Sequence, residues 1–258
     1  MRALDRFGRA TIDFFEYAGG LTLLSAESLG FMLQLRIRIA ETISQAALLG
    51  VQSLLIVCLT SLFTGMVISL ESAQQAVAYG FSNLVGGAVA YASVRELGPM
   101  LTGVVVAGRV GAAIAAELGS MVVTEQIEAL RSMGVEPPRF LVVPRLLALL
   151  LMLPLLTIFA DVVSIAGGAW IAQTYAHIPY DSFVSSVRES IDFSDVLKGL
   201  VKSVVFAAII ALVGAYQGLS TRGGAAGVGR STTFAVVLAI ILIFASNFVL
   251  SFLLFGGR

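Results

Sequence analysis

A few charged side chains stand next to long apolar runs, and they are the residues with the clearest potential for chemistry. Arg95 and Glu96 come just before Gly98-Pro99, at the start of one such run. A guanidinium donates a fork of hydrogen bonds that matches a phosphate. Glu96 would repel a phosphate, so we expect it to orient Arg95 or to shape the site around it. The pair predicts a place for an anionic group.

The side chains that lead up to this pair form one graded helical face. Phe63, Val67, Glu71, Gln75 and Tyr79 recur every fourth residue, so a helix that continues through them changes from apolar to polar along that face. Such a surface suits an amphiphile with apolar tails and a charged head; a helix end meeting water is the alternative. The candidate substrate-binding residues are Val67, Leu70, Glu71, Gln75, Tyr79, Arg95 and Glu96.

Three further polar residues, Arg109, Glu117 and Asp161, lie inside apolar runs. A central arginine in a membrane costs at least about 2.5 kcal/mol, so Arg109 is expected to face protein or water. Glu117 follows two turns later, about 12 Å along a helix, which is too far for a direct pair with Arg109. For Arg109 and Asp161 the sequence leaves a functional role and a structural hydrogen bond both open.

Residue counts argue against several kinds of chemistry. The chain has one cysteine, Cys58, and one histidine, His177, so a metal site built from these residues would lack ligands. The lysines are Lys198 and Lys202, and neither stands in the glycine-rich pattern of a phosphate-binding loop. We therefore expect no enzyme active site, no metal and no cofactor in this chain. The net charge of +0 gives no reason to expect nucleic acid.

The composition indicates that lipid is the main solvent of this chain. Of its 258 residues 58% are hydrophobic and 12% are charged, against about 25% charged in soluble domains. A bilayer core of about 30 Å needs about 20 apolar residues per helix. The segments that qualify are about 46–70, 97–121, 146–173, 200–218 and 233–255. The predicted fold is an all-α integral membrane protein with a periplasmic helical segment, one domain over 1–258 with its transmembrane region over 46–258.

The segments that flank these spans set the predicted orientation. Residues 1–45 are helical in character but too charged to span, so we expect interfacial helices there, with a soluble surface pair as the alternative. With the N-terminus cytoplasmic, ten arginines lie inside and five Lys or Arg residues lie outside. This excess favours a cytoplasmic N-terminus and a periplasmic C-terminus. The run 223–229 is predicted to be a flexible turn, with Ser231 or Thr232 capping the last span.

Small residues mark the second span as a packing surface. Two adjacent stripes repeat every fourth residue: Ala107, Gly111, Ala115 and Gly119, and Gly108, Ala112, Ala116 and Ser120. Such stripes let another helix approach closely in lipid. Gly214 and Gly218 repeat the pattern in the fourth span. Packing within the chain is the main interpretation, and part of the surface is a candidate dimer seam.

The loop between the second and third spans predicts a short helix over about 125–133. Thr124 is the expected N-cap, Gly134 fits the position after the C-terminus, and Pro137-Pro138 stop the helix. Ile127 and Leu130 fall on one side. A capped amphipathic helix needs a surface to dock on, either in this chain or in a partner.

Several of these stretches together resemble the MlaE (YrbE-like) permease family. They are Arg95-Glu96-Leu97-Gly98-Pro99, Ala107-Gly108-Arg109-Val110-Gly111, Ala115-Ala116-Glu117-Leu118-Gly119, Glu125-Gln126-Ile127-Glu128-Ala129-Leu130 and the run 223–233. The resemblance extends over essentially the whole chain.

The resemblance implies a homodimeric permease in the inner membrane of a Gram-negative bacterium that moves phospholipids and maintains outer-membrane lipid asymmetry. Its expected partners are a cytoplasmic ABC ATPase that binds ATP, a STAS-domain protein and a periplasmic-facing MCE-domain protein. The short loop helix is then the ATPase-coupling element, with Glu125, Ile127, Glu128, Leu130 and Arg131 as coupling residues. An ion-coupled secondary transporter of an amphiphile and a lipid-modifying membrane enzyme are the alternatives.

Overall fold

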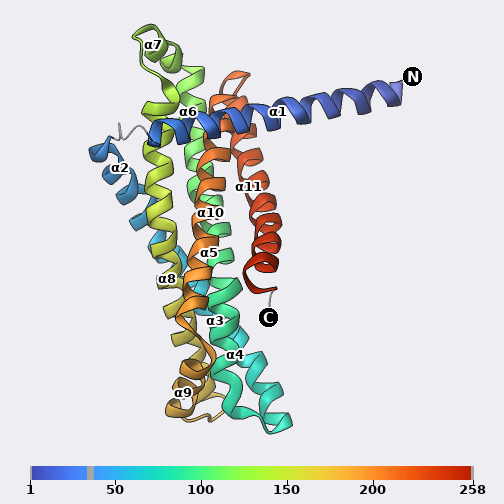
Figure 1. Cartoon of the computed structure of the whole chain (residues 1–258), viewed down its shortest axis with the longest axis vertical. Coiled ribbons are helices and arrows are strands. Elements are labelled where there is room, and N and C mark those ends of the chain that lie inside the picture. The colour runs from blue at the N-terminus through green and yellow to red at the C-terminus, as the bar shows by residue number, and fades with distance from the viewer. Residues whose placement is uncertain (1, 34–37, 257–258) are drawn as a thin grey trace.

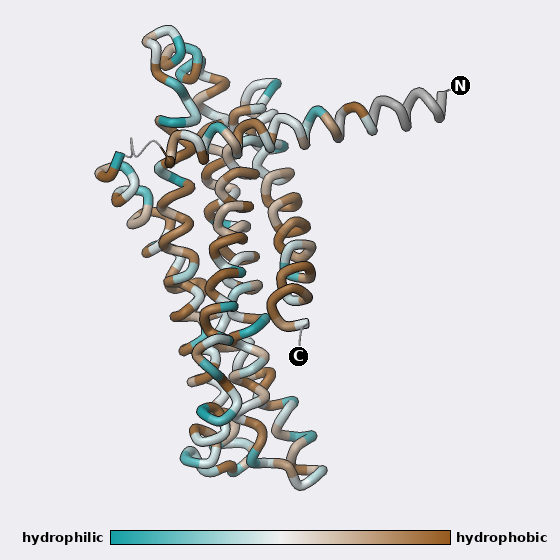
Figure 2. The backbone as a smooth tube through the Cα atoms, viewed as in Figure 1, coloured by the Kyte–Doolittle hydropathy of each residue, from teal (hydrophilic) through white to brown (hydrophobic). Residues whose placement is uncertain are grey.

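The computed structural model describes residues 2–33 and 38–256, and every regular element in that part of the chain is a helix. Among the described residues, five helices are long and apolar enough to cross a membrane, which confirms the predicted fold class. Their bounds are Ile39–Tyr79, Ser82–Val123, Pro138–Thr174, Phe193–Leu219 and Gly224–Phe255. Each begins earlier than predicted, because charged and small residues extend the helices beyond their apolar centres. Figure 2 shows hydrophobic residues along the bundle and hydrophilic ones gathered toward its two ends.

Helix α1 (Arg2–Leu33) crosses one end of the bundle and extends away from it (Figure 1). It is held by Tyr17, whose hydroxyl accepts a hydrogen bond of 2.8 Å from Nε2 of Gln217, and whose ring meets Tyr216 edge-on at 4.8 Å. Burial raises the pKa of the Tyr17 hydroxyl, so this group stays protonated. Gly20 lies so close to the Tyr216 ring that no Cβ would fit there. This crosswise position fits the predicted interfacial helix.

The region over 1–45, where interfacial helices were predicted, does not contain a second separate helix where the structure describes it. Helix α2 (Ile39–Ala46) runs through the π-turn η1 (Ala47–Val51) directly into α3 (Gln52–Tyr79). Residues 34–37 lie outside the described part of the chain. Because the helical hydrogen bonds continue from Ile39 onward, the residues of α2 belong to the first long helix.

The second long helix is interrupted by two π-turns. After the 3₁₀ turn η2 (Ser82–Leu84) come α4 (Val85–Ala92), η3 (Ser93–Leu97), α5 (Gly98–Val106), η4 (Ala107–Gly111) and α6 (Ala112–Val123). Another π-turn, η5 (Pro138–Val142), opens the third long helix, ahead of α8 (Val143–Thr174). A π-turn widens the helix and leaves carbonyls without their usual partners, and such turns are frequent at functional sites. Of the polar residues predicted from sequence, Arg95 and Glu96 lie in η3 and Arg109 lies in η4.

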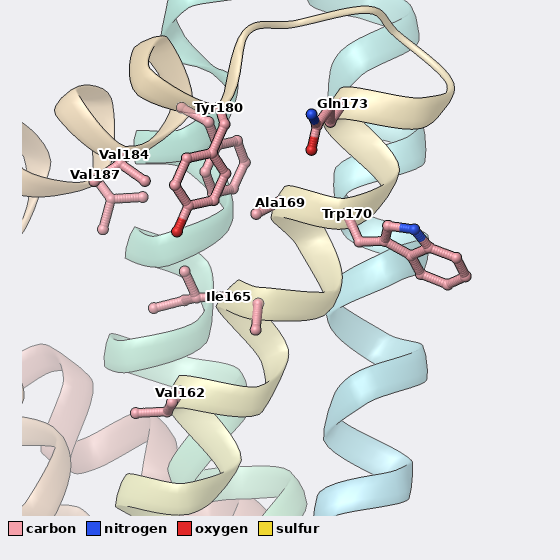
Figure 3. A pocket seen from close by; sticks show the side chains of 10 residues that line it. Val162, Ile165, Ala169, Trp170, Gln173, Tyr180, Val184 and Val187 are labelled. Carbon is pink, nitrogen blue, oxygen red and sulfur yellow. The ribbon is translucent and has the colours of Figure 1, made fainter.

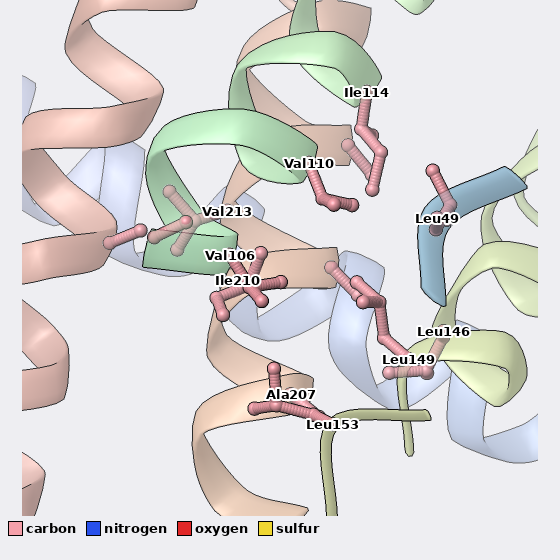
Figure 4. Packing of buried hydrophobic residues seen from close by; sticks show 14 of the residues in the cluster. Leu49, Val106, Val110, Ile114, Leu146, Leu149, Leu153, Ala207, Ile210 and Val213 are labelled. Carbon is pink, nitrogen blue, oxygen red and sulfur yellow. The ribbon is translucent and has the colours of Figure 1, made fainter. Parts of the chain in front are cut away.

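Two separate apolar cores hold the molecule together. The membrane core joins α5, η4, α6, α8 and α10 (Phe193–Leu219) through residues such as Val106, Ile114, Leu149 and Ile210 (Figure 4). The second core lies in what we call the α9 lobe, formed by α4, by α9 (Tyr180–Ser190) and by the ends of α3 and α8 that pack on them. In Figure 1 this lobe extends beyond the end of α11 (Gly224–Phe255), opposite the short helix α7 (Gln126–Ser132). Helix α9 is a helical segment between the third and fourth long helices, outside the predicted spans.

The two small-residue stripes of the second span have different surroundings. The stripe of Ala107, Gly111, Ala115 and Gly119 is buried. A Cβ on Gly214 would lie 3.1 Å from the carbonyl oxygen of Gly111, so α10 packs closely against this stripe. Gly108 and Ser120 of the other stripe are exposed, and nothing lies within 4 Å of a Cβ placed on Gly108. Only one stripe is used within the chain.

The glycine-rich run before the fifth span is helical, which corrects the predicted flexible turn. Helix α11 begins at Gly224, preceded by Gly223 with φ of 90°. Ser231 and Thr232 therefore lie inside the helix and are not its N-cap. A left-handed Gly223 turns the chain, and Gly227 then packs so closely on the carbonyl of Arg222 that a side chain would not fit.

Candidate functional site

The graded face of α3 is continuous and uncovered in the chain. Helix α3 reaches Tyr79, and Phe63, Val67, Glu71, Gln75 and Tyr79 are all exposed, with Leu70 partly buried beside them. The face is exposed because α3 packs on the rest of the chain through its opposite face. Ser61, Gly65, Ser69 and Ala73 are buried against α8, and a Cβ on Gly65 would collide with the Ser164 carbonyl. This stripe of small residues on α3 was not predicted, although the recurrence of small residues at every fourth position could have indicated it.

Arg95 is buried and already holds partners from its own chain. It lies in η3, and its Nε and Nη2 donate hydrogen bonds of 3.0 and 2.6 Å to Oδ1 of Asp195. The guanidinium also donates to the Tyr91 hydroxyl and lies over the Phe255 ring at 4.3 Å. The N–H donors that were predicted to bind a phosphate therefore bind the Asp195 carboxylate in this structure. Contact with a phosphate would require the Arg95–Asp195 ion pair to break.

Glu96 binds other residues than Arg95, so of its two expected roles the orienting one is wrong and the shaping of the site stays a prediction. Its Oε1 accepts hydrogen bonds from Nζ of Lys202 and from Ser251, each at 2.8 Å, and its Oε2 accepts one of 2.9 Å from Nδ2 of Asn247. Lys202 is fully buried and also donates to the Arg95 carbonyl at 2.8 Å. That carbonyl lies within η3, so the lysine satisfies a group at the π-turn.

We call Arg95, Glu96, Asp195 and Lys202 the α10 charge cluster. It joins η3, α10 and α11 at the boundary between the membrane core and the α9 lobe. From sequence, Lys202 was counted only as one of the five cations outside the membrane, and Asp195 was not a candidate. The spacing of these two residues puts them on one face of α10, two turns apart, which was the available signal. Asp195 also takes part in the capping box that starts α10.

The three intramembrane polar residues are not brought together. Arg109 donates 2.6 Å and 2.8 Å hydrogen bonds to Oγ of Ser53 and Oε1 of Gln52. Glu117 forms an ion pair of 2.7 Å with Arg145 instead, as expected from its distance to Arg109.

Asp161 lies apart from both. It is 7% exposed, and its Oδ1 has no hydrogen-bond partner among the described residues. That oxygen occupies the place where any Cβ on Gly98 would lie. Close by, the hydroxyls of Ser93 and Ser164 hydrogen-bond to each other at 2.9 Å.

The short loop helix is present as α7, one residue shorter at each end than predicted. Ile127 is buried and Leu130 is partly buried against the membrane core, whereas Glu125, Glu128 and Arg131 are exposed. Gly134 has φ of 74°, as expected for the residue after a helix. Thr124 is not the N-cap, because its hydroxyl donates back to the Ser120 carbonyl at 2.9 Å and Glu125 is left-handed.

One apolar groove of about 460 Å³ lies between α8 and α9 (Figure 3). Tyr180, Val184 and Val187 line it from α9, and Val162, Ile165 and Ala169 line it from α8. No sequence pattern pointed to it, because it depends on how α9 folds back. Among the described residues no three His, Cys, Asp or Glu side chains gather as metal ligands.

Comparison with known proteins identifies the family of this chain. Residues 42–253 match the family profile described as Permease MlaE. The chain belongs to the MlaE permease family. It is therefore a transport subunit of the membrane.

Relatives match along most of its length. A probable ABC transporter permease protein of Synechocystis is 42% identical over 98% of this chain and 97% of the relative. The intermembrane phospholipid transport system permease protein MlaE of Haemophilus influenzae is 33% identical over 98% of both chains. The chloroplast protein TRIGALACTOSYLDIACYLGLYCEROL 1 of Arabidopsis thaliana is 39% identical over 84% of this chain and 62% of the relative.

Proposed function

We propose that this chain is the membrane-spanning permease of an ABC-type transporter that moves phospholipids between the inner and outer membranes and maintains outer-membrane lipid asymmetry. The observation that carries the proposal is the uncovered face of α3. It leads from apolar Phe63 and Val67 to polar Glu71 and Gln75. A face of this kind matches acyl tails at one end and a head group at the other, and the Haemophilus relative is named for phospholipid transport.

The substrate cavity forms between two copies of the chain. The face of α3 and the open stripe of Gly108 and Ser120 are exposed, and α11 is the least buried of the five long helices. A second copy placed on this side covers these surfaces and encloses the α3 faces. In lipid, the small residues of the open stripe allow the close backbone approach that such an interface needs.

The two ends of the bundle meet different partners. Helix α7 presents Glu125, Glu128 and Arg131 to a cytoplasmic ABC ATPase, which binds the ATP, and a STAS-domain protein joins on that side. The α9 lobe faces a periplasmic-facing MCE-domain protein. This assignment places the chain in the inner membrane with a cytoplasmic N-terminus and a periplasmic C-terminus. It is supported by the arrangement in Figure 1, where α1 and α7 share one end and α9 lies at the other.

The proposal is tested with Leu70→Arg, which places a charge where acyl tails belong. Burial of each methylene is worth about 0.8 kcal/mol, so a charged wall should strongly reduce tail binding. We expect the assembled complex to hydrolyse ATP but to hold less phospholipid and to lose ATPase-dependent lipid transfer between vesicles. Leu70→Phe, which keeps the wall apolar, is the matched control. Lipid transfer by the wild-type permease without its ATPase would favour the ion-coupled alternative.

A further inference from the structure

Arg109 lies deep within the membrane-spanning part of the second long helix. Along the helix axis it is about 21 Å from Arg95 and about 12 Å from Glu117. Because the apolar layer of a bilayer is about 30 Å thick, the guanidinium lies at hydrocarbon depth, nearer the α7 end. A cation at this depth is costly unless protein, water or an anion surrounds it.

No counter-charge for Arg109 comes from the described chain. Its two hydrogen bonds go to neutral oxygens, Oγ of Ser53 and Oε1 of Gln52. No carboxylate among the described residues lies within ion-pair distance of it. By contrast, Arg95, Arg145 and Lys202 each meet a carboxylate. A guanidinium has five N–H donors, so Arg109 keeps donors for a further partner.

The side of Arg109 away from the bundle core is open. Gly108 and Ala113 are exposed, and Ala112 is only partly buried, so its own helix offers no large side chain to cover it. Gln52 is exposed as well. The missing anion can therefore approach from outside the chain.

Gln52 lies on the same face of α3 as the proposed substrate surface. Ile56, Leu59 and Phe63 follow it at helical spacing, and all three are exposed. The face thus has polar groups at both ends, Gln52 with Arg109 at one and Glu71 with Gln75 at the other. Between them lies an apolar stretch, about 28 Å from Gln52 to Glu71 along the axis.

We propose that Arg109, assisted by Gln52, binds the phosphate of a phospholipid head group at the α7 end of the α3 face. This inference rests on the proposed function and adds a second head-group position to it. A guanidinium and a phosphate form charge-assisted, often bidentate hydrogen bonds. The acyl tails then lie along Ile56, Leu59 and Phe63. A lipid that moves along α3 thereby meets a polar position at each end of the apolar stretch.

The test uses the full complex with a photoreactive residue in place of Ile56, in vesicles that contain radiolabelled phospholipid. Arg109→Gln should lower crosslinking to phospholipid about tenfold, since hydrogen bonds to a charged group are lost. Arg109→Lys should retain part of it, because the charge remains without the fork. Crosslinking to a neutral, phosphate-free glycolipid should not change. Arg188→Gln, which removes an exposed charge in the α9 lobe, is the matched control.

Equal phospholipid crosslinking in wild type and Arg109→Gln would overturn the inference. Binding of inorganic phosphate at Arg109 without phospholipid crosslinking would also overturn it, because the site would then take free phosphate. Loss of the dimer in Arg109→Gln would show that a second copy supplies the anion. If Arg109→Gln does not fold, Gln52→Ala with the same probe should lower crosslinking, and no change there would contradict the inference. Wild-type protein without ATPase-dependent phospholipid transfer would refute the proposed function itself, whatever Arg109 does.

Discussion

The α10 charge cluster and the Glu117–Arg145 pair hold their cations in different ways. In the cluster, the side chains of Arg95 and Asp195 are only 10% and 4% exposed, and Lys202 is 0% exposed. At the other end Arg145 is 6% exposed, but its partner Glu117 is 51% exposed. Both side chains of the Arg95–Asp195 pair are buried, whereas the Glu117 carboxylate of the other pair is exposed.

This difference in burial shows which of the two ion pairs should contribute more to the stability of the helix bundle. In the cluster, two ion pairs connect η3 with α10, and hydrogen bonds from Ser251 and Asn247 to Glu96 add α11. Loss of one partner of the Arg95–Asp195 pair therefore leaves a buried charge. In the Glu117–Arg145 pair, Arg145 also donates a 2.6 Å hydrogen bond to the Leu141 carbonyl, within η5. It therefore retains a partner when Glu117 is removed. Three substitutions of graded effect test this comparison.

Asp195→Ala should have the largest effect. It leaves the Arg95 guanidinium buried without its carboxylate, and breaking a buried pair costs about 3–5 kcal/mol. We expect a large fall in the midpoint of thermal unfolding of the purified protein. Asp192→Ala is the control, because it removes only the N-cap of α10 and should cost about 1 kcal/mol. Similar midpoints for the two variants would mean that capping, not the ion pair, is what Asp195 contributes.

Lys202→Met should have an intermediate effect. It keeps the volume of the side chain but leaves the Arg95 carbonyl without its donor, at about 1–3 kcal/mol for a buried unsatisfied group. Loss of the lysine costs less free energy at Glu96, because the Glu96 side chain is 40% exposed and keeps Ser251 and Asn247 as donors. The unfolding midpoint should fall between those of Asp195→Ala and wild type. Lys198→Met, near the Phe255 ring but outside the hydrogen-bond network, should differ little from wild type.

Glu117→Gln should have the smallest effect, about 1 kcal/mol or less, since partly exposed ion pairs contribute little. The glutamine oxygen still accepts from Arg145, and the Leu141 carbonyl remains. The same thermal unfolding measurement applies. A loss as large as that of Asp195→Ala would show that the two sites do not differ in the way their exposure suggests.

The membrane class and its spans followed from composition and from apolar runs, because about 20 apolar residues in a row have few other stable settings. The α7 helix and its glycine end followed from local turn chemistry. The start of α11 was predicted wrongly because a glycine-rich run was taken as a turn. Within this run Gly223 and Gly224 have positive φ, and Gly227 and Gly229 lie inside α11.

The sequence by itself determined that lipid surrounds this chain, that one face of α3 grades from apolar to polar, and that charges stand near its ends. These properties are local, since helical periodicity orders the residues along each span. Only the tertiary structure decided which charges face each other. Arg95 meets Asp195 and Glu96 meets Lys202 across a hundred or more residues of chain, because α10 returns beside η3. A sequence pattern cannot distinguish a charge aimed at a ligand from one aimed at a distant helix, since both require the same residue at the same helical position.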